Sequence, residues 1–206
     1  MDGETLLARL RSDNETELSR LGSSKALYAL TGGEMDATSV RAAVAADAAR
    51  AADVLDDWAA AEPHGAAAEL FEAAAATAGD HASLTADADG PTANPYPIYD
   101  DLAALDDTPA RVGGLLARSL LVGETVAQVV GFFVGDADPQ GADEFRTVRS
   151  EVESMRDDAA ALLDDVCDDE ADWVAAEDAG EAVLEGAYGF YVETLESMGI
   201  KPKNVC

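Results

Sequence analysis

Apolar residues recur at helical intervals over almost the whole chain, and prolines and glycines mark where one pattern stops and the next begins. The most apolar stretch runs from Leu115 to Asp138 and is hydrophobic on nearly all sides, which is typical of a helix buried inside a bundle. Within it, small residues recur at every fourth position, and this stripe predicts the close approach of another helix. The stripe consists of Ser119, Gly123, Ala127, Gly131 and Gly135.

The rest of the chain predicts further helices and one irregular connection, and no alternation of period two indicates a strand. Residues 89–108 are rich in proline and tyrosine, and we expect them to form a connecting strap with a short helical turn at residues 102–105. Thr108 followed by Pro109 has the pattern of an N-cap and a first helical residue. The other expected helical ranges are 4–31 with a break at 22–24, 36–62, 66–88, 139–166 and 172–198, where Asp138-Pro139 repeats the pattern of Thr108-Pro109.

Helices of matched length joined by short loops favour an all-α, up-and-down bundle of five to six helices. We expect one domain over residues 1–206, with residues 1–35 as an N-terminal helical segment packed on the bundle. A membrane span is the competing interpretation of residues 115–138. Glu124 and Gln128 interrupt that stretch, however, and its uninterrupted apolar length is below the ~20 residues that a bilayer requires.

The chain carries 42 acidic and 13 basic residues, a formal net charge of -29, while 48% of its residues are hydrophobic. Disordered chains of such charge lack the apolar residues to fold, so this composition indicates a folded protein. We interpret the charge as adaptation to molar salt, which screens repulsion to within about 3 Å. It argues against direct nucleic-acid binding, because no basic patch is available. The N-terminus has no apolar leader, which predicts a cytoplasmic protein.

A metal site is the main candidate for chemistry, because His81, Asp47 and Glu124 each fall on the expected inner face of a helix. Di-iron bundles use two Glu-x-x-His motifs, whereas the residue three positions before His81 is Ala78. The structural alternative is that His81 is a hydrogen-bonded core residue and that Glu124 pairs with Arg118. The two cysteines, at positions 167 and 206, are too few for a disulfide framework.

Four segments resemble those of haloarchaeal proteins of the rubrerythrin family, members of the ferritin-like superfamily. They are TELSRLGSSKALYALT (16–31), DDTPARVGGLLAR (106–118), QVVGFFVGDAD (128–138) and MGIKPKNVC (198–206). The resemblance implies a ferritin-like bundle and, in metal-binding relatives, a di-iron centre with peroxidase or electron-transfer chemistry. This chain departs from such relatives at residues 47–49, Asp-Ala-Ala, where they carry a Glu-His pair, and at residues 78–81, where only His81 remains.

These departures favour a non-enzymatic ferritin-like protein without a cofactor that acts through homodimerisation or a protein partner, with no contact to nucleic acid or membrane. One alternative is a metal-dependent, oxidant-handling protein in which His81, Asp47 and Glu124 hold iron. Another alternative is a transcription-linked or chaperone-like adaptor.

Overall fold

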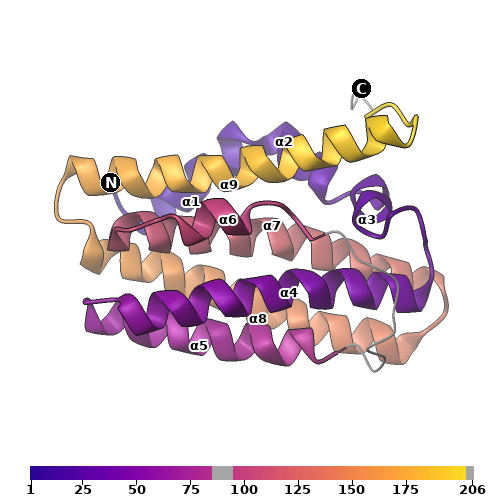
Figure 1. Ribbon diagram of the computed structural model, residues 1–206, viewed down its shortest axis with the longest axis horizontal. Coiled ribbons are helices and arrows are strands. Elements are labelled where there is room, and N and C mark those ends of the chain that lie inside the picture. Colours follow the sequence, from indigo (N-terminus) through magenta and orange to yellow (C-terminus); the bar gives the residue numbers. More distant parts are fainter. Residues whose placement is uncertain (85–94, 203–206) are drawn as a thin grey trace.

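The computed structural model describes residues 1–84 and 95–202, which form nine α-helices and no strand. Five long helices lie side by side along the molecule (Figure 1). They are α4 (Ala37–Ala61), α5 (Gly65–Ala82), α7 (Thr108–Gly135), α8 (Pro139–Val166) and α9 (Glu170–Ser197). The short helices are α1 (Gly3–Asp13), α2 (Glu15–Leu21), α3 (Ser24–Leu30) and α6 (Tyr99–Ala103). The all-α prediction is confirmed for these residues, although they form more helices than the five or six expected.

Aspartate N-caps begin four of the five long helices. Asp36, Asp107 and Asp138 each accept a hydrogen bond from the backbone N–H three residues later, at 2.9 to 3.0 Å. Asp169 forms a reciprocal capping box at the start of α9. Each cap satisfies a backbone donor that the first turn of a helix leaves free. The expected N-cap of α7, Thr108, is one residue too late, because Asp107 is the cap and Thr108 is already helical.

The order of the helices is not a simple up-and-down arrangement. Residues 43–44 of α4 meet residues 122–126 of α7, while residues 54–58 meet Leu115, so these two helices are antiparallel. Since α4 and α5 form an antiparallel pair, α5 and α7 point the same way (Figure 1). The end of α5 and the start of α7 therefore lie at opposite ends of the bundle. This parallel pair corrects the expected up-and-down topology.

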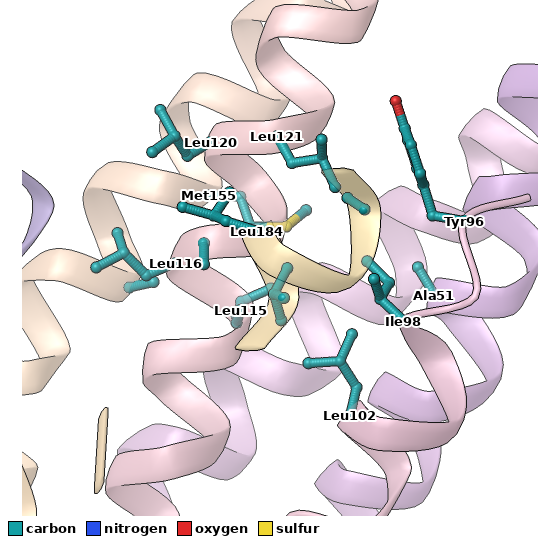
Figure 2. Close-up of a cluster of buried hydrophobic side chains, with 14 of the residues drawn as sticks. Ala51, Tyr96, Ile98, Leu102, Leu115, Leu116, Leu120, Leu121, Met155 and Leu184 are labelled. Atoms are coloured by element: carbon teal, nitrogen blue, oxygen red, sulfur yellow. The ribbon is translucent and has the colours of Figure 1, made fainter. Parts of the chain in front are cut away.

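Helix α7 lies at the centre of the core and contacts both α8 and α9. Figure 2 shows its side chains packed between those two helices and the segment before α6. The labelled core residues are Ala51, Tyr96, Ile98, Leu102, Leu115, Leu116, Leu120, Leu121, Met155 and Leu184. By length and hydropathy α7 is able to span a membrane, but 61% of its most apolar window is buried inside the protein. This packing is that of a helix in the core of a bundle.

Among the described residues, no other helix packs closely on the glycines of the small-residue stripe of α7, which corrects that expectation. Ser119, the first member of the stripe, is buried. A methyl group added to Gly123, Gly131 or Gly135 would meet no atom of another element within 4 Å. The close approach occurs instead at Gly113, where an added Cβ would lie 2.1 Å from the carbonyl oxygen of Ala176 on α9. Four-residue spacing identifies a face of a helix, but it does not say which face is covered.

The N-terminal helices α1 to α3 pack across α7, α8 and α9. The expected break at residues 22–24 is present, and a second break at Asn14 separates α1 from α2. Gly32 and Gly33 end this segment with φ angles of 62° and 97°, a region that favours glycine. Of the expected strap, residues 95–108 bury Tyr96 and Tyr99 in the core, and residues 89–94 lie outside the described part of the chain.

Candidate functional site

A buried polar cluster lies in the middle of the bundle, where α4, α6 and α7 meet. Asp47 projects from α4, Tyr99 from α6 and Arg118 from α7, and all three residues are buried. One terminal nitrogen of Arg118 donates to Asp47 Oδ2 at 3.1 Å, and its Nε donates to the Tyr99 hydroxyl at 3.1 Å. The guanidinium of Arg118 therefore bridges a carboxylate and a phenol.

Electrostatic interactions fix the protonation states of Arg118 and Tyr99. Burial favours the neutral form of Arg118, but the neighbouring Tyr99 oxygen and the Asp47 carboxylate outweigh this effect and raise its pKa. Burial also raises the pKa of Tyr99 well above its usual value of 10.0, and the negative charge of Asp47 adds to this shift. The phenol consequently keeps its proton, and the charges of Arg118 and Asp47 cancel.

A second buried chain of hydroxyl groups lies beside the cluster. The hydroxyls of Tyr96 and Thr125 are 3.2 Å apart, and Thr125 Oγ1 donates to the Leu121 carbonyl at 3.2 Å. Complete burial raises the pKa of Tyr96, and the charge on Asp47 acts in the same direction. Polar groups from α4, α6, α7 and residue 96 therefore form one interior region.

The cavities that adjoin this region are small. One cavity of about 20 Å³ touches Asp47, Tyr96 and Thr125. A second, of about 10 Å³, touches Tyr99 and Arg118 on the other side. Sites for small organic molecules occupy several hundred cubic ångströms, whereas a single water needs roughly 10 to 15 Å³. Neither of these cavities has space for an organic substrate.

The residues proposed as metal ligands have separate partners and surroundings. Asp47 is held by Arg118, whereas His81 Nε2 lies 2.7 Å from Glu151 on α8. Glu124 is exposed, with its carboxylate beside Gly22. Within residues 1–84 and 95–202, no three His, Cys, Asp or Glu side chains are grouped to hold a metal ion.

The expected inward position of Glu124 is wrong. It lies on α7 two turns before Gly131, and both residues are on the face that points away from the core. The pairing of Glu124 with Arg118 is corrected for the same reason, since Arg118 pairs with Asp47. The sequence does contain a signal for the observed pair, because Arg118 interrupts the apolar run LLARSLL and must find a partner when that helix is buried.

The chemistry open to the cluster is limited by the hydrogen bonds of Arg118 and by the balanced charge of Arg118 and Asp47. Arg118 prevents Asp47 from presenting an uncompensated charge to a metal ion, and the buried phenols stay protonated. Comparison of the chain with models of protein families, with curated proteins and with solved structures finds no match in any of the three. Function is therefore inferred from the sequence and the structure alone.

Proposed function

We propose that this protein is a non-enzymatic, ferritin-like helical bundle that acts by binding another protein chain, in the first instance a second copy of itself, in a high-salt cytoplasm. The observation that supports this most directly is the Asp47–Arg118 pair. A guanidinium fills the position beside the carboxylate that a metal cation would require, and the adjoining cavities hold no more than water. The bundle interior thus serves packing rather than catalysis.

The parallel direction of α5 and α7, which are consecutive long helices, supports the ferritin-like part of this proposal. Ferritin-like bundles have one long crossover connection, whereas simple up-and-down bundles have short loops throughout. The resemblance of residues 16–31, 106–118 and 128–138 to rubrerythrin-family segments is consistent with the same arrangement. In this interpretation Asp47 and His81 remain from a ligand set whose other members are absent.

An uncharged face near the end of α7 supports binding to another protein. Residues 125–135 carry no charged side chain, although the chain as a whole has a net charge of -29. On this face Val134 is 56% exposed, and Gly131 is exposed as well. Charged residues are depleted at the centres of protein interfaces. A second acidic chain meets no charged side chain between Glu124 and Asp136 on this face.

Elemental analysis tests the non-enzymatic part of the proposal. The wild-type protein and His81→Ala are incubated in molar KCl with and without ferrous iron, then desalted and measured for bound metal. We expect no stoichiometric iron in either protein. Iron bound at one or more atoms per wild-type chain and lost in His81→Ala would refute the proposal and favour the oxidant-handling alternative.

Sedimentation equilibrium in molar KCl tests the binding part. We expect a species of twice the 21.3 kDa chain mass, and we expect Val134→Asp to convert it to the monomer. Val174→Asp is the matched control, because Val174 is an exposed valine on α9, 48% exposed, outside the uncharged face. A wild-type monomer at every concentration would exclude homodimerisation. Equal effects of the two variants would exclude the α7 face.

A further inference from the structure

Three of the ten arginines of this acidic chain lie on one stripe of α8. The members of this α8 stripe follow one another at intervals of three and four residues, so they share one side of the helix. They are Arg146, Arg149, Glu153 and Arg156. Ala160 continues the stripe and is buried against α1, whereas the first three members are 40 to 54% exposed. The α8 stripe is therefore a charged surface that α1 leaves uncovered.

The uncharged face of α7 lies on the same side of the bundle as the α8 stripe. The N-terminal segment marks this side on both helices, because Gly3 lies against α8 and Gly22 lies beside Glu124 of α7. Beyond Glu124, the exposed Gly131 and Val134 continue this side of α7. The two helices thus present one joint surface that the N-terminal segment does not cover.

The order of the charges along the α8 stripe is self-complementary. Arg146 and Glu153 lie about 5 Å on either side of a midpoint between residues 149 and 150. In a two-fold interface residue i meets residue j, and j meets i. A two-fold axis through this midpoint therefore sets Arg146 of each of two antiparallel α8 helices opposite Glu153 of the other. It also sets Asp143 of each copy level with Arg156 of the other.

Within one chain the charges of the α8 stripe pair only with neighbours on the same helix. Arg146 pairs with Asp143, and Arg149 pairs with Glu153 at 2.9 Å. Exposed pairs of this kind contribute little to the stability of a protein. A guanidinium has five N–H donors and a carboxylate accepts several hydrogen bonds, so both groups can also bind a second chain.

The same axis brings the uncharged face of α7 to a cleft in the second copy. Asp138, in the turn after α7, and Ala161 are equally far from the midpoint of the α8 stripe. Ala161 lines a cleft of about 650 Å³ between α1 and α8, and the apolar Leu7 lies in its wall. Val134, which is 56% exposed, precedes that turn. The second copy therefore offers the exposed valine an apolar wall.

We propose that two copies of the chain associate through antiparallel α8 helices, with Arg146 of each copy bound to Glu153 of the other and with Val134 against the cleft between α1 and α8. This inference rests on the proposed homodimer and specifies its symmetry and its ion pairs. A second copy is favoured over an unrelated acidic protein, because the match requires an acid and a base at one fixed spacing and this chain supplies both. Charges buried at the interface are screened by salt much less than exposed ones.

Charge reversal on α8 tests the pairing. Arg146→Glu, Glu153→Arg and the double variant that carries both changes are compared with the wild type by sedimentation equilibrium in molar KCl. Each single reversal sets like charges opposite each other at two places, so we expect it to raise the dissociation constant of the dimer at least about tenfold. The double variant exchanges the two charges and restores the match, so we expect a dissociation constant within about threefold of the wild-type value.

Arg50→Glu is the control for the change in net charge, because Arg50 is 48% exposed and lies on α4, away from the α8 stripe. It should leave the dissociation constant unchanged, and an equal weakening would refute the pairing. A wild-type monomer at every concentration would refute the proposed homodimer and this inference with it. A wild-type dimer that the single reversals leave intact, or that the double variant does not restore, would refute the antiparallel α8 pairing alone.

Discussion

Replacement of Arg118 by methionine removes the cation from a buried ion pair and leaves the Asp47 carboxylate without compensation. The two side chains are 5% and 10% exposed, and the joining N–O distance is 3.1 Å. At an effective dielectric constant of about 20, unit charges at that separation attract by about 5 kcal/mol. Breaking a buried pair by removing one partner typically costs about 3 to 5 kcal/mol. We expect Arg118→Met to lower the free energy of unfolding by a similar amount.

Removal of both charges should restore most of this loss. In the Asp47→Leu/Arg118→Met double variant no buried charge is left unpaired, and apolar replacement of such pairs is often neutral or stabilising by about 1 to 4 kcal/mol. A double-mutant cycle with Asp47→Leu therefore isolates the coupling between the two side chains. We expect a coupling free energy of at least about 2 kcal/mol, near the upper part of the range for contacting residues.

Urea unfolding followed by circular dichroism measures these free energies without changing the ionic strength. The cycle is run at low salt and in molar KCl, because salt screens exposed charges much more than buried ones. Arg50 and Asp100 serve as the control pair, since they are joined at 2.8 Å but are 48% and 93% exposed. Exposed pairs contribute about 0 to 1 kcal/mol and weaken with salt.

A coupling free energy between Asp47 and Arg118 below about 1 kcal/mol, the upper limit expected for an exposed pair, would contradict the assignment of a strongly coupled buried pair. That assignment would also be contradicted if the coupling fell with salt to the same extent as that of Arg50 and Asp100. Either result would mean that water reaches the cluster.

Two further predictions concern packing and acid stability. Gly113→Ala places a Cβ 2.1 Å from the carbonyl oxygen of Ala176, so we expect it to lower the thermal unfolding midpoint by the equivalent of roughly 1 to 3 kcal/mol. Gly131→Ala meets no neighbour and should raise the stability by up to about 1 kcal/mol; equal effects would contradict the assigned faces of α7. Burial of Glu62 by itself raises the pKa of this carboxyl, but hydrogen bonds, chiefly from Thr108 at 2.6 Å, outweigh it and hold the pKa below the usual 4.5. The contribution of ionised Glu62 to the free energy of unfolding is complete above pH 4.5 and is lost as the pH falls through the lowered pKa. Glu62→Gln should therefore make the free energy of unfolding depend less on pH in the acid range. An unchanged pH dependence would show that Glu62 is not the responsible group.

The helices and most of their ends were predictable because the signals that define them are local. Asp36 caps α4 through a hydrogen bond to Ser39, and Gly32, Gly33 and Gly199 adopt positive φ angles where helices end. Each acts within a few residues of its own position. The all-α class follows from the same information. The main error of this kind is the cap of α7, where Asp107 and Thr108 are both good capping residues and only geometry chooses between them.

The candidate site was predictable only in part. Asp47 and His81 were correctly placed on buried faces, since each continues the apolar stripe of an amphipathic helix. Glu124 was misplaced because α7 is apolar on nearly all sides, so its periodicity does not distinguish the covered face from the exposed one. The partner of Arg118 depends on the packing of α4 and α6 against α7, which no local pattern contains.

The sequence by itself determined that this chain is helical, where its long helices begin and that its surface is extremely acidic, because propensity, capping and charge are properties of neighbouring residues. The tertiary structure decided that α5 and α7 point the same way, that Gly113 rather than the glycines from Gly123 to Gly135 receives a helix, and that Arg118 neutralises Asp47. These outcomes depend on contacts between residues tens of positions apart. Such contacts form only when all the apolar faces are buried at once.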